Sequence, residues 1–348
     1  MAQEVTEIRT PDGMSEMEDE WNGLLADSEE NDLFLTSGWM TNWWSNFGSS
    51  HELRLIALRE DGKLIALAPF ILSKRGRVLG WSKLQFLATG PSDHLGIIVR
   101  RGHDSAYAAI FKRIEQWKDW DVLELRELWE HGPTLSHLRS AYPTGEMARG
   151  ASPFVNVSQG YAAFMASLHK NTRHNLVRYW NKMERELHCR FEVGCGPGEA
   201  KRCLPLLKEL SLRRWDDEGT SPFSQPGVYD FLESSLGQAT GERALFHGIW
   251  IEDRPIALVL GFRYLDRYLY YIPAYDPAFA NFSPGFVLHS KIIQDCTARG
   301  ITEVDFLRGA ENHKFRFNAT DRGLVHFRYI RDGPLRRVEA KAREGRFV

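Results

Sequence analysis

Ionisable side chains are concentrated in one short segment, residues 305–317, which reads DFLRGAENHKFRF. Asp305, Glu311 and His313 belong to the residue types that accept a proton from a reacting group. The ammonium group of Lys314 can stabilise a developing negative charge or bind an anion. The segment therefore suggests acid–base chemistry, although a structural ion pair between Asp305 and Lys314 would give the same pattern. We expect the interleaved aromatic residues to anchor the segment in the core: Phe315 and Phe317.

A second feature is the tripeptide Ser283-Pro284-Gly285 at the start of a predicted helix. Proline at the first helical position costs no hydrogen bond, and glycine lets another group approach the backbone closely. A helix N-terminus with free N–H groups attracts anions, so a phosphate or pyrophosphate could bind there without a dedicated lysine. Any capped helix can show the same tripeptide, so this signal is weak by itself.

Both features lie in the second of two similar stretches of chain. Each stretch has an apolar hairpin with an acidic turn, then an amphipathic helix, then a strand. The repeated order predicts a duplicated α/β unit. The hairpins are expected at 53–72 and 244–264, the helices at 103–117 and 284–300, and the strands at 121–128 and 301–309. A connector rich in Pro and Gly separates the halves. We assign residues 1–150 to the first half, 151–335 to the second and 336–348 to a basic tail.

The sequence AYDPAFANFSPGFVLHSKII, followed further on by DFLRGAENHKFRF, resembles the pattern of a known family. The family is the GNAT-superfamily acetyltransferase-like group of bacterial polysaccharide and cellulose biosynthesis clusters. It is related to the Fem peptidoglycan-bridge aminoacyltransferases. The resemblance covers roughly residues 30 to 330 and includes LHKNTRHNLVR at 168–178. It implies an α/β fold of tandem GNAT-like halves, each a mixed β-sheet flanked by helices.

The resemblance also implies an activity, the transfer of an acyl group, above all acetyl, to an amine or hydroxyl. The second half would bind acetyl-CoA or another acyl-CoA as co-substrate, and the first half would form the acceptor side of a cleft. A small molecule or a saccharide would be the acceptor. A backbone N–H around residues 272–275 would polarise the thioester carbonyl, and Tyr275 would protonate the departing thiolate.

Individual residues take their expected roles from the same resemblance. The catalytic candidates are Asp305, Glu311, Lys314 and Tyr275. The candidates for binding the CoA pyrophosphate are Ser283, Gly285, Phe286 and Val287. The candidates for binding the acceptor are Arg173, Asp93, His94 and His313. The family usually has Tyr where His313 stands, so the imidazole either replaces a phenol proton donor or only packs.

Composition limits the class of protein. The chain has 348 residues and a formal charge of -2, and a protein built to hold nucleic acid would show a basic excess. Neither a signal peptide nor a transmembrane segment is evident, and four cysteines without C-x-x-C spacing indicate reduced thiols, so we expect a cytoplasmic protein. No metal is expected, because the spacing of His289, Glu311 and His313 matches no ligand pattern. The oligomeric state stays open.

Two other functions fit the same resemblance. One is Fem-type transfer from aminoacyl-tRNA, which the balanced charge disfavours. The other is a non-catalytic protein that keeps the fold to bind a saccharide or an assembly partner, which would have no need of the SPG tripeptide or of the Asp, Glu and Lys set.

Overall fold

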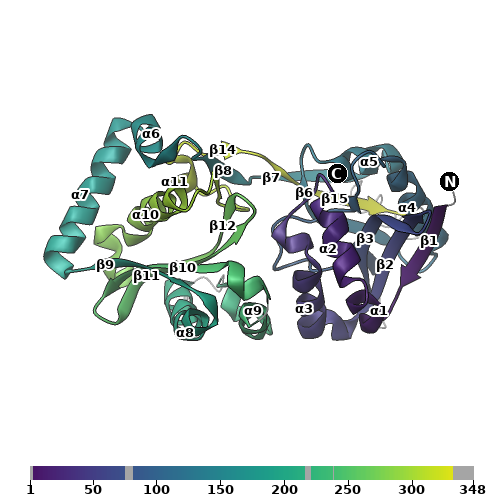
Figure 1. Cartoon of the computed structure of the whole chain (residues 1–348), viewed down its shortest axis with the longest axis horizontal. Coiled ribbons are helices and arrows are strands. Elements are labelled where there is room, and N and C mark those ends of the chain that lie inside the picture. Colours follow the sequence, from purple (N-terminus) through teal and green to yellow (C-terminus); the bar gives the residue numbers. More distant parts are fainter. Residues whose placement is uncertain (1–2, 75–80, 216–220, 238, 332–348) are drawn as a thin grey trace, which may run out of the picture. The chain divides into compact units, whose positions relative to one another are not determined.

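The computed structural model describes residues 3–74, 81–215, 221–237 and 239–331. The chain forms two compact units (Figure 1). Unit 1 comprises residues 1–150 together with the chain from Gly323, and unit 2 comprises residues 151–322. Among the described residues, none of the helices has the length and apolar character needed to cross a bilayer.

Unit 1 is built on a mixed sheet with the strand order β1-β2-β3-β4-β6-β15-β7, in which β5 also pairs with β3. Among the described strands of this sheet, β4 and β6 are the pair that runs parallel. The predicted hairpin is β2 and β3, which turn at Asp61-Gly62, both with positive φ. The strands are β1 (Gln3–Ile8), β2 (His51–Glu60), β3 (Lys63–Lys74), β4 (Ser82–Phe86), β5 (Ile98–Val99), β6 (Val122–Trp129), β7 (Glu146–Gly150) and β15 (Leu324–Ile330).

The helices of unit 1 pack on this sheet through their apolar faces. In α4, the buried residues Ala106, Ile110 and Ile114 follow helical spacing, which is why the sequence predicts this helix correctly. Helix α2 packs on β3, α4 on β2 and β3, and α5 on β6. The helices are α1 (Pro11–Ser15), α2 (Glu18–Ala26), α3 (Ser37–Phe47), α4 (Ser105–Gln116) and α5 (Pro133–Ala141).

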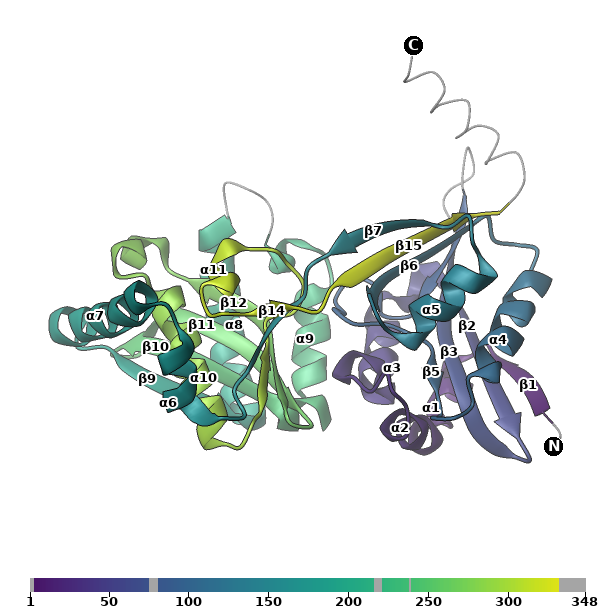
Figure 2. The same ribbon diagram turned by 90° about the horizontal axis from the view of Figure 1, so that it is seen from above.

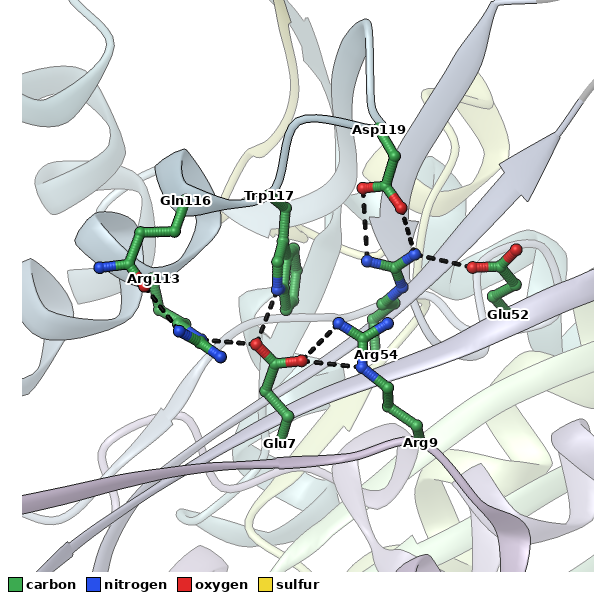
Figure 3. A network of polar contacts seen from close by, with 8 residues as sticks. All are labelled: Glu7, Arg9, Glu52, Arg54, Arg113, Gln116, Trp117 and Asp119. Carbon is green, nitrogen blue, oxygen red and sulfur yellow. Dashed lines mark hydrogen bonds and ion pairs between the residues drawn. The ribbon is translucent and has the colours of Figure 1, made fainter.

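A network of charged side chains attaches the edge strand β1 to the end of α4 (Figure 3). Trp117 Nε1 donates to a Glu7 carboxylate oxygen at 2.7 Å, and the same oxygen accepts from Arg113 Nε at 2.5 Å. On the other side of the indole, the Arg54 guanidinium lies 5.3 Å from the ring centroid and is paired with Asp119. Because Arg54 is almost fully buried, these partners are needed to offset its desolvation.

Glu30 is a buried carboxyl group at the N-terminus of α5. Its oxygens accept hydrogen bonds from Thr134 Oγ1 at 2.6 Å and from the Thr134 amide at 3.2 Å. The helix begins after Gly132, which has no side chain to cap it, so Glu30 supplies the missing acceptor from a distant part of the chain. Burial raises the pKa of Glu30 to about 7, against the opposing effect of the Thr134 hydrogen bonds.

This carboxyl group is expected to make unit 1 less stable as the pH rises. The folded-state pKa of Glu30, about 7, lies above the ordinary value of 4.5. The contribution of Glu30 to the stability of unit 1 is therefore complete below pH 4.5 and is lost as the pH rises through 7. The shift corresponds to roughly 3 kcal/mol. We expect Glu30→Gln to raise the melting temperature of unit 1 at about pH 8 and to flatten its pH dependence, as measured by calorimetry. The same pH dependence in both proteins would contradict this assignment.

Unit 2 repeats the architecture of unit 1. Its strand order β9-β10-β11-β12-β13-β8-β14 corresponds position by position to that of unit 1, and its parallel pair, β12 and β13, corresponds to β4 and β6. The predicted fold class, tandem α/β halves with mixed sheets, is confirmed. The strands are β8 (Pro153–Asn156), β9 (Arg190–Cys195), β10 (Ala244–Ile251), β11 (Arg254–Tyr264), β12 (Arg267–Tyr275), β13 (Glu303–Asp305) and β14 (Thr320–Asp321).

Helices cover both faces of the unit 2 sheet. Figure 1 shows α8 and α9 on one face and α7 and α10 on the other. Helix α10 buries Val287, Leu288, Ile292, Ile293 and Cys296 in the core. The helices are α6 (Gly160–Ser167), α7 (Lys170–Leu187), α8 (Gly196–Trp215), α9 (Val228–Leu236), α10 (Pro284–Ala298) and α11 (Asn312–Phe315).

The last strand lies in a different unit from the one that the sequence analysis gives it. Residues 324–330, placed above in the second half, form β15 in the sheet of unit 1, between β6 and β7 (Figure 2). Phe327 is completely buried there. In unit 2 the corresponding position beside β13 is taken by β8, which precedes the rest of that unit in the chain. The proposed tail, residues 336–348, lies outside the described residues.

Candidate functional site

The parallel strands of unit 2 part soon after they meet. β12 and β13 pair only from Arg267 and Glu303 to Leu269 and Asp305, whereas β12 continues to Tyr275. On its other edge β12 pairs with β11 through a bulge, where the register shifts between Leu260 and Gly261. Beyond Leu269 the edge of β12 that faced β13 is therefore outside the ladder. Bulges and unpaired edges of this kind commonly lie next to active sites.

Helix α10 begins close to the end of β12. Ser283 has a left-handed φ of 51° and its side chain makes no capping bond. The Val287 amide donates to the Ser283 carbonyl at 3.2 Å, which leaves the amides of Gly285 and Phe286 as the unsatisfied donors of the first turn. Within the described residues no acceptor contacts either amide. A Cβ on Gly285 would lie 3.6 Å from the Tyr275 ring, so the helix start and the strand end adjoin.

The four residues expected to bind the CoA pyrophosphate differ in whether their backbone amides are available. Gly285 and Phe286 present free amides, and Ser283 forms the turn that exposes them. Val287 is buried in the core, and its amide is already used by the helix. The Arg316 guanidinium lies 4.2 Å from the Phe286 ring centroid, which brings a positive charge to the side chain of this residue.

Arg214, at the end of α8, was missed by the sequence analysis. Its guanidinium carbon lies 4.6 Å from the Tyr275 ring centroid, and its charge contributes to lowering the pKa of both His289 and His313. Arg213, its neighbour, instead pairs with Asp276 and Glu209. A basic pair at a helix C-terminus is common because it complements the helix dipole, so the sequence offers no signal that sets Arg214 apart.

Asp305 is fully buried at the end of β13, where it stabilises a turn. Its Oδ1 accepts a hydrogen bond from the Leu307 amide at 2.8 Å, and Arg322 lies 3.8 Å from its other oxygen. Leu307 has a φ of 58°, a left-handed conformation that costs a non-glycine residue about 1–2 kcal/mol. Asp305 therefore helps to hold a strained turn, and the ion pair with Lys314 considered above does not form.

Lys314 is buried and its ammonium group holds the loop that follows this turn. Nζ donates to the carbonyl of Arg308 at 2.8 Å and approaches those of Gly309 at 3.4 Å and Leu307 at 3.5 Å. Its ionic partner is Glu311, at 2.9 Å. Burial, the largest single influence, raises the pKa of Glu311, but the charge and hydrogen bond of Lys314, a backbone hydrogen bond and the charge of His313 together bring the pKa below its usual value. Through these contacts Lys314 stabilises the conformation of the loop.

The aromatic residues of the segment differ in burial. Phe317 is completely buried, as expected, whereas Phe315 is 39% exposed and does not anchor the segment. His313 is half-buried, and its ring contacts that of His289 on α10, with centroids 5.3 Å apart. Burial lowers the pKa of His313, and Glu311 acts against that shift.

The remaining acceptor-site candidates belong to the other unit or have structural contacts. The Arg173 guanidinium donates to the carbonyls of Met165 and Ala166 at 3.2 and 3.3 Å, so it caps the end of α6. Asp93 and His94 belong to unit 1 and are buried. His94 pairs with Asp32 at 3.0 Å, and its ring centroid lies 3.8 Å from that of Trp129. Among the described residues, no cluster of three or more His, Cys, Asp or Glu side chains is arranged to hold a metal.

Residues 170–315 match the model of the acetyltransferase (GNAT) domain family. No match was found among curated proteins. The crystal structure of FemX is similar with a TM-score of 0.65 and 12% identity over 96% of this chain and 99% of that one.

Two further solved structures cover most of the chain. A tandem GNAT protein from the clavulanic acid biosynthesis pathway gives a TM-score of 0.53 at 11% identity, over 96% of this chain and 99% of that one. The C-terminal domain (DUF2156) of a putative lysylphosphatidylglycerol synthetase from Agrobacterium fabrum gives 0.55 at 10% identity, over 90% and 92%. Identities this low establish the fold alone. Residues 170–315 thus match the acetyltransferase (GNAT) domain model, and the chain has a fold similar to that of the tandem GNAT protein.

Proposed function

We propose that unit 2 transfers an acyl group, most simply acetyl, from acyl-CoA to an amine or hydroxyl of a small-molecule or saccharide acceptor. The observation that carries this proposal is the start of α10. There, two free amides adjoin the end of a strand that has left its parallel neighbour, inside the segment that matches the GNAT family. A helix N-terminus of this kind binds pyrophosphate through its amides and its dipole.

Different groups of the site would bind the pyrophosphate, polarise the thioester and protonate the thiolate. The amides of Gly285 and Phe286, with the Arg316 guanidinium nearby, would hold the pyrophosphate. The edge of β12 beyond Leu269 would offer a backbone N–H to the thioester oxygen, which gains negative charge in the transition state. The Tyr275 hydroxyl would protonate the thiolate. Asp305, Glu311 and Lys314 would act through the loop that they hold rather than on the reacting atoms.

A Fem-type aminoacyl transfer is the second candidate, and the likeness to FemX over nearly the whole chain favours it. Against it stands the formal charge of -2, since a protein that binds tRNA usually carries a basic excess. The motif resemblance supports a role in polysaccharide biosynthesis. We also propose that the protein acts in the cytoplasm, because its four cysteines lack C-x-x-C spacing and indicate reduced thiols.

A thermal-shift panel tests the proposal. It compares acetyl-CoA, longer acyl-CoAs, free CoA and an aminoacyl-tRNA, each added to the full chain. A specific ligand at 100 times its Kd should add about 2.7 kcal/mol of stability. Stabilisation by the CoA compounds supports the proposal. Stabilisation by the aminoacyl-tRNA alone would establish the Fem-type alternative instead.

Gly285→Val is expected to abolish CoA binding while leaving unit 2 folded. The new Cβ would meet only the Tyr275 ring at an ordinary contact distance of 3.6 Å, but the added methyl groups would stand beside the two free amides. The control is Gly198→Val in α8, since a Cβ at Gly198 meets nothing within 4 Å. Thermal unfolding with and without CoA measures both effects. Full protection of the Gly285 variant by CoA would place the donor site elsewhere.

A further inference from the structure

The ring of His289 lies where β12 and β13 part. It projects from the second turn of α10, is 4% exposed, and stacks on Tyr270 with centroids 4.6 Å apart. Tyr270 directly follows the last residue of β12 that pairs with β13, and Phe306 directly follows the last paired residue of β13. Phe306 and Phe317 contact the same imidazole at 5.5 and 5.4 Å. The imidazole of His289 is thus surrounded by three aromatic side chains at the point where the two strands separate.

The hydrogen bonding of His289 determines which nitrogen can act. Nδ1 lies 2.5 Å from the Gly285 carbonyl oxygen, which can only accept, so Nδ1 carries the proton. Burial lowers the pKa of His289 to about 3, and the ring is therefore neutral with a lone pair on Nε2. Nε2 is buried and has no hydrogen-bond partner in the described part of the chain. An unsatisfied buried acceptor typically costs about 1–3 kcal/mol, so a donor is expected to meet it.

His313 is the neighbour that can supply this donor. Its ring meets that of His289 edge to face, at 73° and 5.3 Å between centroids, and it is half-buried. No hydrogen bond to its ring is found within the described residues. The charged groups that act on it are Glu311, Lys314 and Arg316, from its own segment, and Arg214, from α8. Catalytic hydrogen bonds are often long before the substrate binds and tighten in the complex.

We propose that His289 and His313 form a dyad that serves the acyl transfer. His289 Nε2 accepts the N–H of His313, which fixes the His313 tautomer and leaves its other ring nitrogen as the proton acceptor. The nucleophilic nitrogen or oxygen of the acceptor then bonds to the thioester carbonyl carbon, and its proton passes to His313. The C–S bond breaks, and the CoA thiolate takes the proton of the Tyr275 hydroxyl, which is restored from protonated His313 through solvent. His289 is a positioning residue and does not contact substrate. This inference rests on the proposed function.

Three variants test the dyad in an assay that needs no knowledge of the natural acceptor. Hydroxylamine serves as the nucleophile with acetyl-CoA, and CoA release is followed with a thiol reagent. We expect His313→Phe to lower turnover by about 10²–10⁴-fold. His289→Phe, which keeps the ring stacking, should lower turnover by at least about 10-fold, while His289→Gln, which keeps an acceptor, should recover most of it. The control His188→Asn changes an exposed histidine of the same unit and should have no effect.

The second measurement does not depend on turnover. In protein labelled with ¹⁵N-histidine, His313 should be a single tautomer in the wild type and a mixture in His289→Phe, with a lowered pKa because the acceptor is lost. The His188→Asn spectrum should match the wild type for His313. An unchanged His313 signal and titration in His289→Phe would overturn the dyad, even if turnover falls.

The two proposals fail in distinguishable ways. If the wild type neither binds CoA nor releases it from acetyl-CoA, the proposed acyl transfer fails, and the tautomer of His313 still decides whether the two rings are paired. If the wild type turns over and both His289→Phe and His313→Phe do so normally, the acyl transfer stands and the dyad is wrong.

Discussion

Replacing Lys314 by methionine is expected to destabilise unit 2 and to reduce turnover together. Methionine keeps much of the buried stem, but it leaves the Arg308 carbonyl, now 2.8 Å from the ammonium, without its donor. Loss of a buried charged donor costs about 2–4 kcal/mol. The loop from Leu307 to Glu311 would then lose its shape, and His313 with it. Calorimetry and CoA release on the same protein measure the two effects.

The alternative role for Lys314 predicts a different result. If the ammonium acts on the reacting or anionic group, the variant should keep its melting temperature and lose about 10²–10³-fold in turnover. The paired change Lys314→Met with Glu311→Gln gives a further test, because removing both members of a pair should recover part of the lost stability. A folded variant with normal turnover would remove Lys314 from both roles.

Ending the chain at Arg322 is expected to unfold unit 1 and to leave unit 2 folded. The truncation removes β15, whose residues Leu324, Val325 and Phe327 are buried against the sheet, and β7 loses the strand with which it pairs. Burial of three large side chains contributes roughly 5–8 kcal/mol, which is comparable with the whole stability of a typical domain. Loss of one of two calorimetric transitions would show the effect.

A milder change in the full chain checks the same contact. Phe327→Ala should cost unit 1 about 3–5 kcal/mol, because the site is completely buried. The matched control is Phe315→Ala in unit 2, which removes a side chain that is 39% exposed and should cost much less. Equal losses at the two positions, or two intact transitions in the truncated protein, would show that β15 contributes little to unit 1.

The paired organisation was predictable because each half encodes its own hairpin, helix and strand in local patterns. β2 and β3 turn at Asp61-Gly62, and α4 and α10 bury residues at helical spacing, so local patterns suffice. The unit to which β15 belongs could not be read from the sequence. Alternation along a strand specifies which face is buried, but it says nothing about which sheet the strand joins.

The partners in the charged segment depend on backbone geometry that residue types do not reveal. Leu307 and Gly309 both have positive φ, at 58° and 120°, and the loop that they shape brings its carbonyls to Lys314. The sequence therefore identified a segment of interest, but the ion pair that it left open for Lys314, with Asp305, differs from the observed one with Glu311. For His289, the sequence led only to a rejected metal set with Glu311 and His313. Its unpartnered nitrogen becomes visible once Tyr270, Phe306 and Phe317 surround the ring.

The position of β15 also determines the order in which the protein can mature on the ribosome. Unit 2 is a continuous stretch, residues 151–322, and can close its sheet as soon as it emerges. Unit 1 has to wait for residues 324–330, which at about 5–20 residues per second arrive roughly 9–36 s after Gly150 has been synthesised. During that interval β6 has an uncovered edge, which is a template for pairing with other chains. Unit 2 can thus fold before unit 1, which reverses the usual N-terminal-first order of folding. A chaperone would be needed most while unit 1 is still incomplete.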